Sequence, residues 1–482
     1  MAETLDVPGR TPTGLKLRLF LMMFLQYFVQ GSYLPVVTEY LRSGLGFSPT
    51  QLGAFGAAIS IGPLVAPFLI GQLVDRHVAT ERVLSFCHFA GGIIMISLFF
   101  LEGFWPIFLL GAAYSALYVP SMMLTNSLTF SHLLDREREF PLVRLWGTIG
   151  FVLPAWWVEM VYLKGLEGSE LDRARGIVLM FAGISGLLMA VYSLTLPHTP
   201  PMKKDQPDLA PGKVLQLLKL RHFAVLVGIS LVVAVSHKYF FVWNSPFLRH
   251  ILDQVGIHAA LEGRISSIGQ IAEVLVMTGL GWSLKRYGFK ATMLAGAAAY
   301  LLRCLLFALA VTIEGGQASY SMAGWMPQLD MNGPAAMVFS LVALGQALHG
   351  FCFGCFLATA YMYVDRVAPA DVRGSMQTFY GTFIVGAGMF AGGFVGGWIG
   401  ELFETSPDAT PLRSALGVTS QAGMAEFVRE LPDGTAEAFV ADWTGIWLSG
   451  AVIAAVALVG LWLLFPRDAG LSEETGGERL EA

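Results

Sequence analysis

Charged residues are scarce in this chain, and their scarcity excludes an ordinary soluble domain. Of its 482 residues, 13% are charged and 55% are hydrophobic, whereas soluble domains carry about 25% charged residues. The formal net charge of −5 is mild, which argues against a nucleic-acid partner. No signal-peptide cleavage pattern precedes the first apolar run, so we expect the first spanning helix to act as its own insertion signal.

Cysteine is also rare, and its placement argues against metal or redox chemistry. The four cysteines, Cys87, Cys304, Cys352 and Cys355, all lie inside apolar runs. Cys352 and Cys355 have the CxxC spacing of redox and zinc sites. Since no second cysteine pair and no histidine pair completes a tetrahedral set, we interpret all four as small buried thiols.

Motifs of soluble catalysis are absent as well. The chain has no Walker loop, so ATP is not a visible energy source, and no recognisable serine, histidine and acid set recurs. We therefore expect no enzyme activity and no cofactor or metal. An ion gradient is the remaining source of energy.

Long apolar runs predict an all-α integral membrane protein. A spanning helix needs about 20 mostly apolar residues, and twelve segments qualify. They are residues 15–41, 50–73, 82–102, 104–131, 141–163, 175–196, 222–251, 262–284, 290–313, 334–364, 374–402 and 443–465. We expect these helices to form two six-helix halves.

Polar breaks define the predicted domains. Residues 1–196 form the first half, 197–221 a cytoplasmic linker, 222–465 the second half and 466–482 a cytoplasmic tail. The loop at 404–442 is expected outside the cytoplasm, with a short amphipathic helix around Gln421–Leu431. Most Lys and Arg residues fall in the loops on the side of the two termini, which places both termini in the cytoplasm of a bacterial cell.

Two short turns repeat between the halves. The second predicted helix is followed by Gly71-Gln72-Leu73-Val74-Asp75-Arg76, with Arg82 shortly after it. The eighth predicted helix is followed by the corresponding turn, Gly281 to Lys290. The first resembles the signature loop of the major facilitator superfamily; in the second, Lys285 replaces the acid. We expect Gly71, Asp75, Arg76 and Arg82 to act as a cytoplasmic gate, although positive-inside topology alone would also explain the basic residues.

Polar side chains within the apolar runs are candidates for function, because a charge at the bilayer centre costs about 2.5–3.5 kcal/mol even on mild scales. Arg144, Thr148 and Phe151 stand at i, i+4 and i+7 and would share one helix face. Arg144 alone is also explained by snorkelling to the membrane surface. Gln26 and Gln30 share a face of the first helix at i, i+4.

The second half offers the one carboxylate deep within a predicted helix, Glu273, which shares a face with Gln270. A buried Glu has a raised pKa that a nearby cation lowers again, so Glu273 is the leading candidate for a proton switch. The alternative is a structural ion pair with Lys238 or Arg303. We interpret Arg303 as structural, and His88 and Asn126 as hydrogen-bonding residues between helices.

These residues together resemble the bacterial nucleoside:proton symporter family of the major facilitator superfamily. The most specific block is Arg144-Leu145-Trp146-Gly147-Thr148-Ile149-Gly150-Phe151. Further matches are Leu25-Gln26-Tyr27, Gly31-Ser32, Cys87-His88, Tyr118-Val119-Pro120 with Asn126, Leu194-Thr195-Leu196-Pro197-His198, Gln270-Ile271 with Glu273, Arg286-Tyr287-Gly288 and Leu302-Arg303.

The resemblance implies a substrate pocket and three departures from it. The family's pocket residues correspond to Arg144, Thr148, Phe151, Gln270, Glu273 and Phe353. At three further positions the family's Gln, Asn and Asp are replaced here by Lys238, Phe241 and Gly354. Losing hydrogen-bonding groups relaxes substrate choice, and Lys238 either pairs with Glu273 or attracts an acidic group on the substrate.

We therefore expect a monomeric symporter that carries a nucleoside or similar small polar solute with a proton by alternating access. Gln26, Gln30, Lys238 and Phe241 complete the predicted binding site, and Arg144 assists Glu273 in proton coupling. Symport of a sugar, a glycoside or a small anionic metabolite is the alternative within transport. A membrane sensor without transport activity, on the same fold, is a remote alternative.

Overall fold

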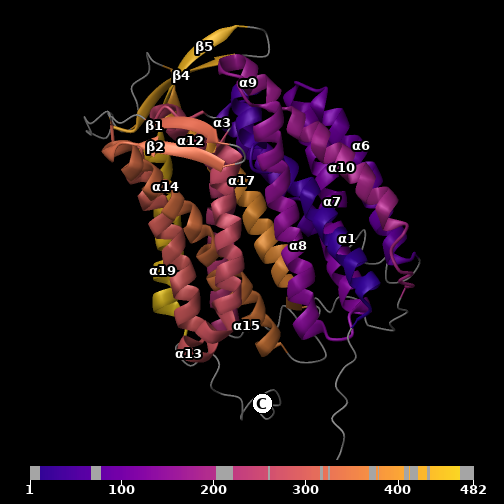
Figure 1. Cartoon of the computed structure of the whole chain (residues 1–482). Helices are drawn as coiled ribbons and strands as arrows, with labels where there is room; N and C mark the ends of the chain where they lie inside the picture. The colour runs from indigo at the N-terminus through magenta and orange to yellow at the C-terminus, as the bar shows by residue number, and fades with distance from the viewer. Residues whose placement is uncertain are drawn as a thin grey trace, which may run out of the picture. The chain divides into compact units, whose positions relative to one another are not determined.

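Long apolar helices make up most of the computed structural model of this chain. The model describes residues 11–66, 78–201, 221–258, 261–314, 318–323, 326–368, 376–377, 379–406, 412, 422–430 and 435–466. Within these residues, nine helices are long and apolar enough to cross a membrane. Figure 1 labels the helices and strands along the chain.

The chain packs into two compact units, which we describe separately. The first holds Met1–Tyr40 and Ile61–Asp205. Its helices are α1 (Thr13–Tyr33), α2 (Val37–Glu39), α4 (Gly62–Ala66), α6 (Thr80–Phe99), α7 (Phe104–His132), α8 (Arg136–Trp157), the π-helix η3 (Val158–Tyr162), α9 (Gly168–Ala174) and α10 (Ile177–Ser193).

The second unit holds Leu41–Ser60 and Gln206–Ala482. The π-helix η1 (Tyr40–Gly44) leads into it. Its helices are α3 (Pro49–Ala58), α12 (Arg221–Gln254), α13 (Glu262–Ala310), α14 (Gly333–Phe351), η5 (Cys352–Ala358), α15 (Thr359–Val367), η6 (Phe379–Gly386), α17 (Ala387–Phe403) and α19 (Trp443–Leu464). Its strands are β1 (Ala318–Ala323), β2 (Met326–Met331), β3 (Glu404–Thr405), β4 (Met424–Glu430) and β5 (Ala436–Asp442).

Where the structure describes them, the predicted spans correspond to these helices; residues 67–73, 374, 375 and 378 lie outside the described residues. The 49-residue α13 contains both 262–284 and 290–313, separated by a break at Gly288, whose φ of 77° favours glycine. Segments 50–73 and 141–163 correspond to α3 with α4 and to α8. The prediction of an all-α membrane protein is confirmed. The residue boundaries predicted for the two halves stay a prediction, and residues 41–60 pack with the second unit.

Large apolar side chains cover the outer faces of the helices. Val191 on α10 and Val452 on α19 are 68% and 64% exposed. In water such surfaces would be costly, whereas hydrocarbon accepts them. The four cysteines are all free and buried, as predicted for small packed thiols.

Glycines allow α1 and α8 to approach closely in the first unit. A Cβ atom built at Gly31 would lie 2.0 Å from the carbonyl oxygen of Phe151, and one built at Gly150 would lie 2.2 Å from that of Phe24. Neither position can hold a larger residue without moving a backbone. This contact fixes the helix that carries Arg144 against α1.

The glycines spaced four residues apart on α17 serve packing in the second unit. A Cβ atom at Gly388 would lie 2.5 Å from Ala234 Cβ, and one at Gly400 would lie 2.1 Å from Trp243 Cζ2. The opposite side of α17 meets α3, where a Cβ atom at Gly393 would lie 2.4 Å from the nitrogen of Ala57. Helix α17 therefore packs closely against both α12 and α3.

Two β-hairpins were not predicted. Strands β1 and β2 pair antiparallel from Ala318↔Met331, and β5 pairs with both β3 and β4. The short amphipathic helix predicted around Gln421–Leu431 is wrong, because Met424–Glu430 forms β4. Residues 424–430 mix apolar and charged side chains without strict alternation, so their pattern does not decide between strand and helix, and pairing with β5 favours the strand. Figure 1 shows both hairpins at the same end of this unit, away from α15.

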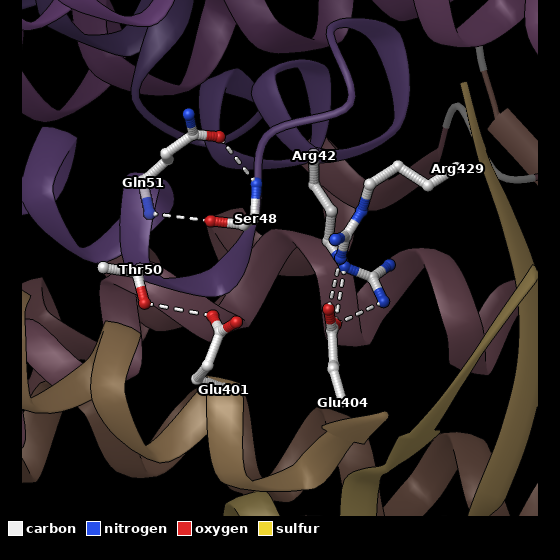
Figure 2. A network of polar contacts seen from close by, with 7 residues as sticks. All are labelled: Arg42, Ser48, Thr50, Gln51, Glu401, Glu404 and Arg429. Atoms are coloured by element: carbon white, nitrogen blue, oxygen red, sulfur yellow. Dashed lines mark hydrogen bonds and ion pairs between the residues drawn. The ribbon is translucent and has the colours of Figure 1, made fainter. Parts of the chain in front are cut away.

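A buried ion network ties the strands to η1. Arg42 contacts Glu404 Oε1 through Nε (2.9 Å) and Nη2 (2.6 Å), and Arg429 Nη2 contacts Glu404 Oε2 at 2.5 Å. All three side chains are buried. The Arg42 guanidinium also lies 4.0 Å from the Phe427 ring centroid. Figure 2 shows both arginines reaching the carboxylate of Glu404, and the exposed Thr50–Glu401 hydrogen bond beside them.

Replacement of Gly150 by leucine is expected to lower the thermal stability of the purified protein. Overpacking costs about 1–3 kcal/mol, and here the clash is with backbone. Gly228→Leu is the control, because nothing lies within 4 Å of a Cβ atom at Gly228. Thermal unfolding in detergent measures both variants, and equal melting temperatures would contradict the close contact.

Replacement of Glu404 by glutamine is expected to destabilise the second unit, because it leaves Arg42 and Arg429 buried without their counterion. Removing one partner of a buried ion pair costs about 3–5 kcal/mol. Glu401→Gln is the matched control, since its hydrogen bond to Thr50 is exposed and such contacts contribute about 0–1 kcal/mol. Chemical denaturation should separate the variants, and equal effects would rule out a structural role for the network.

Candidate functional site

Helix α8 brings the three predicted residues of the first unit onto one half-buried face. Arg144, Thr148 and Phe151 are each partly accessible. The guanidinium of Arg144 lies 4.2 Å from the ring centroid of Tyr27 on α1, a cation–π contact that fixes its direction. Gly147 makes room for it, since a Cβ atom there would lie 2.8 Å from Arg144 Nη1. Arg144 is thus held by an aromatic face that leaves its hydrogen-bond donors available to a ligand.

Gln26 lies in a closed hydrogen-bond network. Its amide nitrogen donates to Ser121 Oγ (3.0 Å), and its amide oxygen accepts from His88 Nε2 (2.8 Å). Tyr118 donates to the Gln26 carbonyl at 2.7 Å. The expectation that His88 bonds between helices is met. Both ends of the Gln26 side chain are occupied, which favours a structural or conformational role over direct substrate contact.

Gln30 and Asn126 are more open than Gln26. Gln30, one turn after Gln26 on α1, is half-buried. Asn126 Oδ1 on α7 is buried and has no hydrogen-bond partner among the described residues. An unsatisfied acceptor within an apolar environment is costly unless a ligand or water completes it. Asn126 therefore joins the candidate binding residues, although its sequence context suggested only a bond between helices.

In the second unit, α13 carries Gln270 and Glu273. Gln270 Oε1 is buried and lacks a hydrogen-bond partner within the described parts of the chain, so it can accept a bond from a ligand. Glu273 is half-buried and acts electrostatically on Tyr300. Phe353 in η5 is partly buried against the apolar core of this unit. An acceptor, an acid and an aromatic ring are thus present in this unit.

The three departures from the family pattern have distinct surroundings. Lys238 on α12 is 7% exposed, and its Cε lies 3.2 Å from a Cβ atom built at Gly56 of α3, so the side chain runs along a glycine surface. The Phe241 ring lies edge-on to His349, with the two centroids 5.6 Å apart. A Cβ atom at Gly354 would lie 2.9 Å from Val276 Cγ1. An acid at 354 would therefore require Val276 to move.

The predicted cytoplasmic gate is described only in part. Gly71, Asp75 and Arg76 lie outside the described residues. Arg82 is exposed in the first turn of α6. Next to it, Glu81 accepts hydrogen bonds from the backbone nitrogen of Thr199 (3.0 Å) and pairs with His198 Nδ1 (2.8 Å).

Replacement of Gln26 by leucine is expected to lower stability, because it leaves His88 and Ser121 without their partner. Interhelical hydrogen bonds in membranes contribute about 0.6–2 kcal/mol each, so two lost bonds give a measurable fall in the thermal midpoint in detergent. Gln30→Leu is the control on the same face. A larger loss from Gln30→Leu than from Gln26→Leu would contradict this assignment.

Known transporters resemble this chain along most of its length. It is 28% identical over 460 residues to the transporter YegT of Escherichia coli K12, covering 94% of this chain and 93% of that protein. It is 26% identical to the nucleoside permease NupG of the same organism, covering 81% and 89%. It is 25% identical to the xanthosine permease, covering 79% and 86%.

Solved structures share the fold. A crystal structure of the nucleoside transporter NupG aligns with a TM-score of 0.73 at 23% identity, covering 94% of this chain and 99% of that one. The D-xylose-proton symporter aligns with a TM-score of 0.64 at 12% identity. A family model described as "Nucleoside H+ symporter" matches residues 13–317 and 329–469. Since that match covers nearly the whole chain, the protein belongs to the nucleoside H+ symporter family.

Proposed function

We propose that this multi-pass membrane protein is a secondary transporter that carries a nucleoside together with a proton. The observation that carries the proposal is the family match over residues 13–317 and 329–469. Two six-helix halves that alternately open a central site to either side of the membrane would provide the route. The protein is a transporter and not an enzyme.

The geometry supports a division of binding roles. Arg144 and Thr148 would donate hydrogen bonds to the hydroxyl or base oxygens of the nucleoside, and Phe151 would stack on its base. Gln270 presents an acceptor that no donor among the described residues satisfies, and a ribose hydroxyl or a base amine would fill it. Phe353 offers a second ring for stacking.

Proton coupling is assigned to Glu273. A half-buried carboxylate on a spanning helix changes its pKa with its surroundings, so that opening the site to one side or the other would bind or release a proton. Arg144, whose guanidinium would hydrogen-bond the bound solute, would assist in the coupling. This is the arrangement that a gradient-driven symporter requires, and it needs neither ATP nor a cofactor.

We place the protein in the bacterial cytoplasmic membrane with both termini in the cytoplasm, on the distribution of Lys and Arg along the sequence. Gly71, Asp75, Arg76 and Arg82 would then lie at the cytoplasmic mouth. The acid and the basic residues of this loop could form ion pairs that break when the cytoplasmic side opens.

An acidic solute is a second candidate, and Lys238 favours it. Its buried ammonium replaces an amide of the family pocket and runs along glycines. A cation in a low-dielectric site attracts an anionic partner strongly. Competition of uridine uptake by xanthosine, whose base ionises near neutral pH, and by sugar acids would separate the two candidates. In Lys238→Gln, only the inhibition of uridine uptake by the acidic competitors should become weaker.

Replacement of Glu273 by glutamine is expected to abolish proton-driven accumulation of uridine in proteoliposomes while exchange of internal for external uridine continues. Glutamine keeps the size and hydrogen bonds of the side chain but cannot titrate. Without a group that binds and releases the proton, the gradient cannot drive uptake, so accumulation should fall to background.

Glu102→Gln provides the control, because Glu102 is exposed in the turn before α7. Its accumulation should equal that of the wild type. Wild-type accumulation by Glu273→Gln would disprove the coupling role, whereas the absence of uridine exchange in the wild type would disprove nucleoside transport itself.

A further inference from the structure

Two histidines and an arginine form a buried cluster in the second unit that the proposed binding roles do not use. Arg303 on α13 is fully buried, and His237 on α12 and His349 on α14 are 5% and 4% exposed. Ionisable side chains at membrane depth are costly and mark functional paths more often than packing. The cluster is therefore a candidate for a role in the transport cycle.

The hydrogen bond between Arg303 and His349 determines the state of the imidazole. Arg303 Nη1 lies 3.2 Å from His349 Nδ1. A guanidinium only donates hydrogen bonds, so Nδ1 must accept. His349 is consequently neutral, with its proton on Nε2. If Nδ1 took up a proton, the bond would be lost and two cations would face each other at this distance.

Aromatic rings hold the His349 imidazole in place. The rings of His237 and Phe240 stack on it, each with a centroid separation of 5.5 Å. His237 is itself fixed by a 2.7 Å hydrogen bond between its Nδ1 and the Tyr300 hydroxyl. Because the imidazole is enclosed in this way, rotation cannot relieve a new charge on it, and the guanidinium must move instead.

The guanidinium has a second edge ready for another partner. Nε and Nη2 of Arg303 have no hydrogen-bond acceptor among the described residues, and Phe240 covers the flat face at 3.7 Å. Two parallel donors on one edge match the two oxygens of a carboxylate. Arg303 is thus bound to His349 at one nitrogen and open to an acid at the other two.

Glu273 lies at the contact between α13 and α14 beside this cluster. A Cβ atom at Gly350 would lie 2.6 Å from the nitrogen of Glu273, and one at Gly269 would lie 3.1 Å from His349 Cβ. Glu273 also acts electrostatically on Tyr300, as do Cys352 and Tyr380. Arg303 acts directly on His349, and Lys238 acts on the neighbouring His237.

We propose that His349 is a proton-responsive positioning residue that exchanges one proton with Glu273 and so selects the partner of Arg303. With Glu273 protonated, neutral His349 holds Arg303. When the proton passes from the Glu273 carboxyl to His349 Nδ1, the O–H bond breaks, an N–H bond forms, and Arg303 moves its open edge to the carboxylate. The net charge of the cluster is unchanged. This inference rests on the coupling role proposed for Glu273.

Replacement of His349 by asparagine tests the exchange, because the amide oxygen can accept the bond from Arg303 but cannot take up a proton. Proton-driven uridine accumulation should fall at least about tenfold and lose its pH dependence between about pH 5 and 8. Uridine exchange should stay within about threefold of wild type, since the proposed binding roles do not include His349. His222→Asn is the control, because the His222 ring packs edge-on against Tyr363 and is not part of the buried cluster.

Wild-type accumulation with a wild-type pH profile in His349→Asn would overturn the proposal. Equal loss of accumulation and exchange in both His349→Asn and His349→Gln would also overturn it, since it would place His349 in folding or binding. A nitrogen-15 NMR titration of histidine-labelled protein needs no transport. The His349 signal should titrate in the wild type and stay neutral in Glu273→Gln. A failure of nucleoside transport alone would therefore be distinguished from a failure of the exchange.

Discussion

The absence of water inside a bilayer is the constraint on which this structure depends. A polar group placed there must find its partner in the protein, because hydrocarbon offers none. Gln26 meets this demand with His88 and Ser121. For the same reason, a buried polar atom without a hydrogen-bond partner indicates a site of possible function. Asn126 Oδ1, Gln270 Oε1 and two nitrogens of Arg303 are buried without hydrogen-bond partners among the described residues, and a transporter needs such groups to bind its cargo and change state.

Close helix packing supplies the geometry in which these groups can act. Gly31 and Gly150 bring α1 and α8 into backbone contact, and this contact places Tyr27 beneath the Arg144 guanidinium. An aromatic face stabilises the cation without consuming its hydrogen-bond donors. A carboxylate in the same place would neutralise Arg144 and leave fewer of its hydrogen-bond donors for a solute. The choice of partner therefore decides whether a buried arginine is structural or available.

The sequence predicts the helices well because the bilayer imposes length and hydrophobicity on each of them. It fails at β4, where seven residues outside the membrane suit a strand or a helix and pairing with β5 decides. It also misses His349: a single histidine in an apolar helix carries no signal until the fold brings Arg303 to its Nδ1. The local sequence pattern indicates the environment of a residue, such as the bilayer. Contacts between residues far apart in the sequence are known only from the structure.

Packing explains two of the positions at which the sequence predicts a departure from the family's pocket. Val276 occupies the space that a side chain at 354 would need, so an acid there would require Val276 to move. Phe241 contributes its ring to the enclosure of His349, where an amide would introduce hydrogen-bonding groups beside an imidazole whose Nδ1 already bonds Arg303. The residue at 241 is thus linked to the enclosure of the Arg303–His349 pair, so that the surroundings of the proposed proton exchange constrain which side chains this position accepts.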